Sequence, residues 1–277
     1  MNLGWKGVLL STMDTINLNS KFARMGARLK IVETRDIRRA ANAISLDVRQ
    51  DNKGEFFEIS AIPSVEINVL DLKAGDRHLL LLVREGEEKS KYLCGHDERH
   101  WFVAGIPEKA SVGTINQAKE SLKPGVVMAV QSRLGLNAKK RNRRKNPAFI
   151  RQGEWFFIPD SETLIDRARV LRNEPLRRGN GGKPHWVDFC YRSGGESVYV
   201  CRKHPNGLLE REYRQLLSTT NDAKHWGWQL MRRNMRVLVK GRVRHADHAT
   251  ITLEGWHQVL MNTESESKAM RNVAFLD

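Results

Sequence analysis

The sequence predicts an α+β protein built from antiparallel β-sheets and a few short helices, with two subdomains joined by a basic segment. Between residues 45 and 104, segments that alternate apolar and polar residues follow one another with only short turns between them. This spacing favours antiparallel strands, because parallel strands need longer crossover connections. Alternating segments return between 149 and 261, after a run rich in Lys and Arg. A chain of 277 residues, 40% of them hydrophobic, is long enough to bury one large core or two modest ones.

The N-terminal part of the chain is predicted to contain one clear hairpin, further strands and several short helices. The turn-forming run 51–54 separates two alternating segments and predicts a hairpin of 45–50 with 55–60. Pro124 and Gly135 are expected to end two helices, because proline cannot continue a helix and glycine accepts the left-handed conformation that follows its last turn. The remaining strands are expected at 65–72, 78–85, 91–96 and 101–104, and the helices at 20–28, 34–43, 114–122 and 126–134.

The C-terminal part is predicted to be a series of hairpins around one helix. Residues 149–158 alternate in the manner of a core hairpin, and Gly194-Gly195 predicts a turn between 186–192 and 197–203. A helix at 208–217, a hairpin of 236–245 with 249–253 and a strand at 257–261 are expected to follow. The resulting division is an N-terminal domain at 14–136, a basic and glycine-rich segment at 137–184, a β-rich domain at 185–262 and a flexible tail at 263–277.

The charge of the chain is concentrated in two stretches. The chain has 47 Lys and Arg against 32 Asp and Glu, a formal net charge of +15, yet no acidic residue occurs in 121–153 or in 223–246. A one-sided distribution of this kind attracts polyanions through counterion release. It predicts binding of DNA or RNA through the phosphate backbone, the alternative being an ordinary solvated surface. The residues expected to contact phosphates are Lys139, Lys140, Arg141, Arg143, Arg144, Lys145, Arg151, Arg232, Arg233, Arg236, Lys240, Arg242 and Arg244.

Two cysteines and two histidines around the expected hairpin at 186–203 suggest a metal site. If the strands pair about Gly194-Gly195, Cys190 and Cys201 share the less apolar face. Thiolate and imidazole ligands suit zinc, and the predicted zinc site consists of His185, Cys190, Cys201 and His204. The alternative is a pair of half-buried free thiols, the usual state of cysteine.

A second group of polar residues predicts catalysis. His245, Asp247 and His248 lie at a strand end, and His257 follows the next strand. Imidazoles and a carboxylate can bind a divalent metal, or supply a general base that activates water against a phosphodiester. His96 or His100, from the loop 94–100, would complete the set. The alternative is a hairpin turn with polar histidines on its rim.

The motifs that are missing from the sequence exclude several activities. The chain has no Walker A loop, GxGxxG, HExxH or GxSxG, so no nucleotide cofactor is expected. The sequence contains no apolar run of about 18 residues, so no membrane-spanning helix is expected. Three well-separated cysteines favour the reducing cytoplasm. The leading function is nucleic-acid binding. The alternatives are a metal-dependent nuclease or phosphodiesterase, and a basic subunit of a larger ribonucleoprotein or protein assembly.

Overall fold

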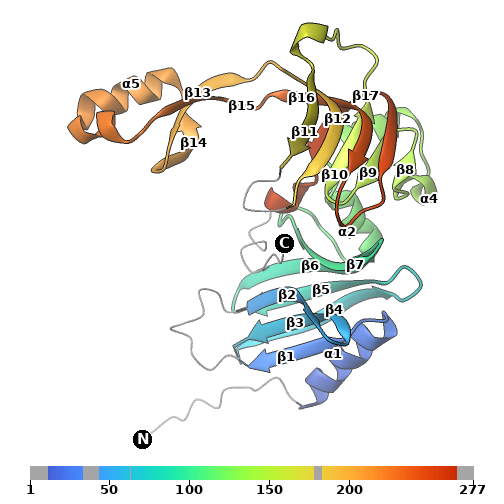
Figure 1. Ribbon diagram of the computed structural model, residues 1–277. Helices are drawn as coiled ribbons and strands as arrows, with labels where there is room; N and C mark the ends of the chain where they lie inside the picture. Colours follow the sequence, from blue (N-terminus) through green and yellow to red (C-terminus); the bar gives the residue numbers. More distant parts are fainter. Residues whose placement is uncertain (1–11, 34–43, 63, 178–182, 267–277) are drawn as a thin grey trace, which may run out of the picture.

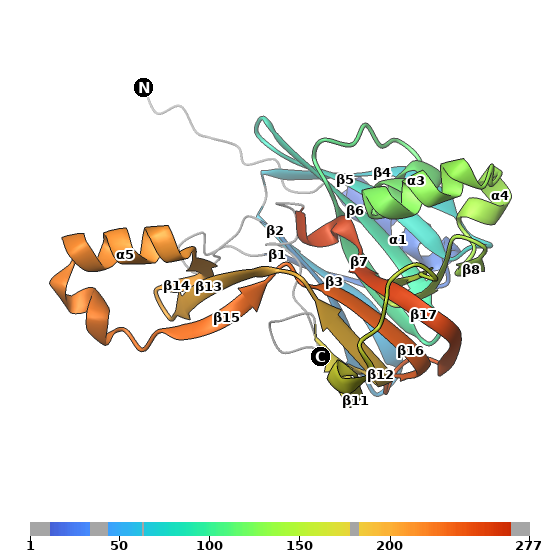
Figure 2. The same ribbon diagram turned by 90° about the horizontal axis from the view of Figure 1, so that it is seen from above.

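The computed structural model describes residues 12–33, 44–62, 64–177 and 183–266, and the predicted helix at 34–43 lies outside this range. The fold is α+β, as predicted, with antiparallel sheets and short helices (Figure 1). It comprises an N-terminal pair of sheets, a C-terminal seven-stranded sheet and an arm that extends from the latter (Figures 1 and 2).

Two sheets pack together in the N-terminal part. Their shared core includes the rings of Phe22, Phe57 and Trp101, with Phe57 lying 5.1 Å from Phe22 and 5.4 Å from Trp101 between ring centroids. The first sheet has the order β1-β3-β2, with β1 parallel to β3, and the second is an antiparallel β4-β5-β6-β7 meander. The elements are α1 (Thr12–Arg24), β1 (Leu29–Glu33), β2 (Ile44–Asp51), β3 (Gly54–Ala61), β4 (Val65–Lys73), β5 (His78–Glu85), β6 (Glu88–Asp97) and β7 (His100–Ile106).

Helix α2 (Ile115–Ser121) covers the other face of the second sheet. Leu80 and Leu93 pack there against Ile115, which explains why β5 is apolar along nearly its whole length. Thr114 caps α2 in a capping box with Gln117. The next helices are α3 (Gly125–Arg133) and the single turn α4 (Ala138–Arg141).

The C-terminal sheet has the order β11-β12-β16-β17-β10-β9-β8. On one face Phe157, Val187, Val239 and neighbouring side chains form a core, and at the β9–β10 end of the other face α3 packs through Val127. Strand β10 is paired with β17, the last strand that the structure describes. The strands are β8 (Lys145–Asn146), β9 (Phe149–Gln152), β10 (Trp155–Pro159), β11 (Leu171–Leu176), β12 (His185–Ser193), β16 (Arg236–Arg244) and β17 (Ile251–Met261), with 3-10 turns η1 (Arg167–Arg169) and η3 (Thr263–Glu266).

The arm is an insertion between β12 and β16. Its sheet has the order β14-β13-β15, and α5 packs on it through a stack of Tyr213 on Tyr199, with ring centroids 4.0 Å apart. Its elements are β13 (Glu196–Cys201), β14 (His204–Leu208), α5 (Glu210–Thr219), the 3-10 turn η2 (Asn221–His225) and β15 (Gln229–Arg233).

The predicted hairpin of 186–192 with 197–203 is wrong. Strand β12 pairs with β11 and β16, whereas β13 pairs with β14 and β15. Gly194 and Gly195 both have positive φ, +67° and +78°, but they carry the chain from one sheet into the other instead of reversing it.

Replacing Gly195 with alanine is expected to loosen the arm. A Cβ at this position would lie 2.7 Å from the carbonyl oxygen of Arg233, and the positive φ is costly for any residue with a Cβ. We expect faster amide hydrogen exchange in 196–233 and unchanged exchange in β16 and β17. The control is Gly125→Ala, where a Cβ meets nothing within 4 Å. Equal exchange in the arm of both variants would contradict the prediction.

Candidate functional sites: a basic groove and a histidine cluster

The first basic stretch, residues 121–153, has acidic neighbours from other parts of the fold. Lys123 and Arg141 pair with Glu120, at 2.6 and 3.4 Å between charged atoms. Arg144 pairs with Asp97 and Glu98 in the turn between β6 and β7. Another predicted phosphate ligand, the guanidinium of Arg151, is half-buried, lies 3.9 Å from Asp97 and donates to the Gly153 carbonyl oxygen.

The second basic stretch is likewise neutralised by carboxylates from neighbouring strands. Arg242 and Arg244 both pair with Asp188 on β12, at 3.1 and 3.5 Å. Arg233 pairs with Glu196, Arg236 with Asp160, and Arg232 donates to the carbonyl oxygen of Gly194. Among the residues of this stretch that were predicted to contact phosphates, only the side chain of Lys240 has no hydrogen bond or ion pair to a described residue.

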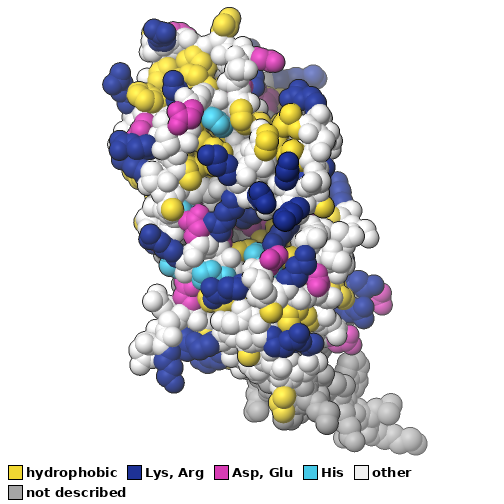
Figure 3. Space-filling model, turned by 90° about the vertical axis from the view of Figure 1, so that its right-hand side faces the viewer, with side chains coloured by type: hydrophobic (Ala, Val, Ile, Leu, Met, Phe, Trp, Pro, Cys, Tyr) yellow, Lys and Arg dark blue, Asp and Glu magenta, His cyan; other side chains and the backbone are white. Residues whose placement is uncertain are grey.

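Five cations between α3 and β8 keep free side chains. None of these five side chains forms a hydrogen bond or an ion pair with any residue that the structure describes. They are Arg133, Lys139, Lys140, Arg143 and Lys145. Lys and Arg side chains gather around a hollow on this side of the molecule (Figure 3).

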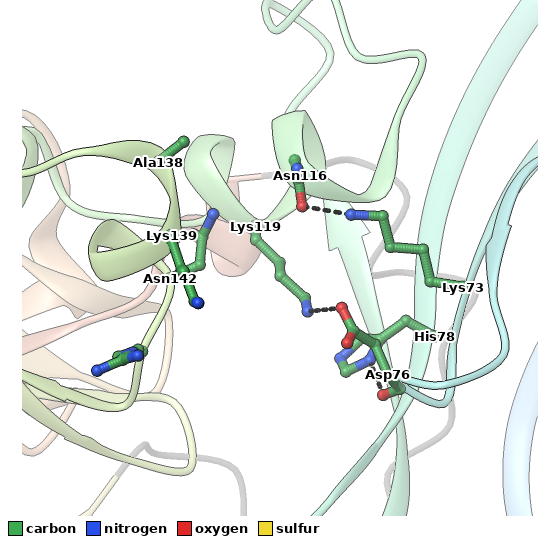
Figure 4. Close-up of a pocket in the computed structure, with 9 residues that line it drawn as sticks. Lys73, Asp76, His78, Asn116, Lys119, Ala138, Lys139 and Asn142 are labelled. Atoms are coloured by element: carbon green, nitrogen blue, oxygen red, sulfur yellow. Dashed lines mark hydrogen bonds and ion pairs between the residues drawn. The ribbon is translucent and has the colours of Figure 1, made fainter.

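A groove of about 530 Å³ lies between α4 and the N-terminal sheet (Figure 4). Lys139 and Arg143 line one wall. On the other side Lys73 donates to Asn116 Oδ1 at 2.7 Å, and Lys119 Nζ lies 3.5 Å from the carboxylate of Asp76. With a single carboxylate among its lining residues, the groove offers a net positive surface to an anion.

His78 lies at the bottom of the same groove as a neutral side chain. Its Nδ1 donates to the carbonyl oxygen of Asp76 at 2.5 Å. Burial, and then the nearby charge of Lys119, lower the pKa of His78 to about 4. The positive charge of the groove therefore comes from its lysines and arginine. His78 was not among the residues predicted from the sequence.

Three histidines cluster at the end of the C-terminal core. His185, at the start of β12, is buried and stacks on His245, with ring centroids 4.1 Å apart and planes 21° apart. His248 lies 5.6 Å from His185 and 4.8 Å from His245 between centroids. One ligating atom of each lies within 4.8 Å of the others. Trp155 packs edge-on against His185 at 6.1 Å.

Hydrogen bonds assign the proton on His245. The Asp247 N–H donates to His245 Nδ1 at 3.1 Å, so the ring proton lies on Nε2, which contacts the carbonyl oxygen of Lys183 at 3.2 Å. The carboxylate of Asp247 pairs with Lys183 Nζ at 3.0 Å instead of with an imidazole. The Asp247 carboxylate is thus hydrogen-bonded to Lys183 and not to the rings of the cluster.

Glu98 connects the N-terminal part of the chain to the cluster. Glu98 has φ of +48° in the β6–β7 turn, and its carboxylate accepts from the Ala249 N–H at 2.9 Å. The same carboxylate lies 3.5 Å from His248 Nδ1. The cluster therefore lies where the two parts of the protein meet.

Burial keeps all three imidazoles neutral at pH 7. It lowers the pKa of His185 to about 3, with a smaller contribution from His245. It also lowers the pKa of His245 and that of His248. At neutral pH each ring therefore keeps one unprotonated nitrogen, and that of His245 accepts the Asp247 N–H.

The predicted catalytic set is only partly brought together. His245, Asp247 and His248 are adjacent, but His257 lies on β17 opposite Val239, and its Nδ1 contacts the Gly255 carbonyl oxygen at 2.9 Å. Among the described residues His257 does not join the cluster. His100, from the loop expected to complete the set, lies 2.6 Å from Glu55 instead.

The predicted zinc ligands do not form a site. Cys190 is buried in the core of the C-terminal sheet, where burial raises the pKa of its thiol to about 11. Cys201 on β13 and His204 on β14 lie opposite each other in the strand register of the arm. His185 belongs to the histidine cluster. The prediction failed because it assumed the β12–β13 hairpin. His185 is the cluster member that sequence reasoning placed elsewhere, and only the register of Trp186 with Arg244 brings it to the 245–248 loop.

No helix in the described part of the chain is both long and apolar enough to cross a membrane. No protein family, curated protein or solved structure matches this chain.

Proposed function

We propose that the protein binds nucleic acid through its phosphate backbone, at the surface formed by α4, β8 and the groove beside them. The observation that carries the proposal is the group of unpaired cations at 133–145. They lie next to a groove whose other wall adds Lys73 and Lys119. Such cations neutralise phosphates and release the counterions condensed on the nucleic acid, which gives binding without regard to sequence.

The proposed interface is smaller than the two basic stretches. The arginines of β16 already neutralise Asp188 and Asp160, so a phosphate would have to compete with these carboxylates. The five unpaired cations of 133–145 face no such competition. They are expected to provide most of the electrostatic free energy of binding.

Removing three of these cations is expected to weaken binding and flatten its salt dependence. The variant is Lys139→Gln/Lys140→Gln/Arg143→Gln. Because each lost phosphate contact lowers the slope of log K against log salt by about 0.7 to 0.9, we expect a decrease of about 2 to 3. The slope is measured by fluorescence anisotropy with labelled single-stranded and duplex oligonucleotides between 50 and 200 mM salt.

A matched variant separates local contacts from net charge. Lys53→Gln/Lys89→Gln/Arg167→Gln removes the same charge from exposed sites on other elements, and its slope is expected to change little. Equal losses in both variants, or affinity independent of salt in the unmodified protein, would contradict the proposal. Chelator-sensitive cleavage of the oligonucleotide would instead support the nuclease alternative, and co-purification with one defined RNA or protein would support the assembly alternative.

A further inference from the structure

We propose that His185, His245 and His248 form a binding site for a late first-row divalent metal ion, Zn²⁺ being the natural occupant. The inference is independent of nucleic-acid binding at the groove. It also differs from the Cys/His site expected from the sequence, since it contains no thiolate. Imidazole nitrogen is a preferred ligand for zinc and its neighbours in the first transition row.

The spacing of the three rings suits one ion. Ligating atoms that all lie within 4.8 Å of one another leave a point no more than about 2.8 Å from each of them. Zinc–nitrogen bonds are about 2.0 to 2.1 Å long, so each ring needs to close by roughly 0.7 Å. The rings lie 21° to 31° from parallel, and binding therefore also requires them to turn so that their lone pairs converge.

An unsatisfied buried nitrogen points to a ligand. His185 is 2% exposed, and its Nε2 has no hydrogen-bond partner among the described residues. A buried polar atom without a partner costs about 1 to 3 kcal/mol, so such atoms are uncommon unless water or an ion satisfies them. A metal bond to this nitrogen would remove the penalty.

Glu98 orients His248 for the same role. Its carboxylate lies 3.5 Å from His248 Nδ1 without completing a hydrogen bond, and this nearby negative charge favours the ring proton on Nδ1 and the lone pair on Nε2. Carboxylates behind histidine ligands commonly fix the tautomer in this way. His245 is held differently: its Nδ1 accepts the Asp247 N–H and its Nε2 contacts the Lys183 carbonyl oxygen, so it has to give up one of these two contacts to bind an ion.

Gly153 leaves room beside the two Nε2 atoms. Its φ is +56°, and a Cβ built there would lie 2.9 Å from His248 Nε2 and 3.7 Å from His185 Nε2. Both nitrogens therefore border the same small space, which a larger residue at 153 would fill.

The test uses the full chain, dialysed against chelator and then against buffer with zinc sulfate. Elemental analysis is expected to return about one zinc per chain, and isothermal titration a single site. His248→Gln is expected to reduce bound zinc to background and weaken binding at least tenfold. When Co²⁺ is used in place of Zn²⁺, its visible d–d absorption bands are expected to appear without a thiolate-to-metal charge-transfer band.

Two further variants make the outcome decisive. His204→Gln removes the arm histidine of the Cys/His set and is expected to leave zinc binding unchanged, while Gly153→Ala is expected to weaken it. Circular dichroism and the melting temperature of the zinc-free variants establish that they are folded. Fewer than about 0.2 zinc per chain in the unmodified protein, or loss of zinc in His204→Gln but not in His248→Gln, would overturn the proposal.

Discussion

At pH 5 the zinc-free protein is expected to be about 4 kcal/mol less stable to unfolding than at pH 7. His185 and His78 carry this effect, because burial lowers their pKa values to about 3 and about 4. The unfolded chain takes up protons at both positions below about pH 6.5, whereas the folded protein does not. Each histidine therefore stabilises the folded state fully above pH 6.5 and progressively less as the pH falls toward its folded pKa. Each contributes about 2 kcal/mol between pH 7 and 5.

Urea unfolding at a series of pH values, in the presence of chelator, measures this dependence. His185→Gln is expected to reduce the fall in unfolding free energy between pH 7 and 5 by about 2 kcal/mol, and His78→Gln to act similarly. His225→Gln changes an exposed histidine and is the control, for which the full fall should remain. A free energy of unfolding that is constant over this range, or that rises on acidification, would contradict the assignment of His185 and His78 as buried neutral groups.

Truncating Phe157 to alanine is expected to lower the free energy of unfolding by about 3 to 5 kcal/mol. Phe157 is completely buried in the core of the C-terminal sheet, with Val187 and Val239 among the side chains of that core. The variant loses the transfer free energy of the ring and leaves a cavity between strands that cannot fully collapse.

Chemical denaturation followed by tryptophan fluorescence measures the change. Leu164→Ala removes an apolar side chain that is 92% exposed, and its effect is expected to stay within about 0.5 kcal/mol. A loss below about 1 kcal/mol for Phe157→Ala would mean that this face of the sheet is not a packed core.

The fold class and most elements could be predicted because their signals are local. Alternation marked β2 and β3 around their turn, and Thr114 and Gln117 mark the start of α2 as a capping box. The partners of β12 could not be predicted in this way. A Gly-Gly pair between alternating segments favours a hairpin, but here the partners of β12 lie 9 to 19 residues before it and 43 to 58 residues after it.

The candidate sites were harder to predict because they depend on pairings across the sheets. The acid-free stretches are acid-free only along the chain, since Asp97 and Asp188 reach their arginines from other strands. The 245–248 histidines were visible as a motif, but His185 joins them only through the β12–β16 register. No local pattern in the sequence carries that register.

The pairing of β10 with β17 determines the order in which the protein can be completed during synthesis. Both N-terminal sheets are formed by strands that end at Ile106, so their cores can close while the rest of the chain is still being made. Trp155 pairs with Met261, and β8, β9 and β10 have no route into the larger sheet until β17 has left the ribosome. The apolar edge of β10 is thus exposed on the nascent chain for more than 90 residues of elongation, an interval in which a chaperone would have its main opportunity to bind.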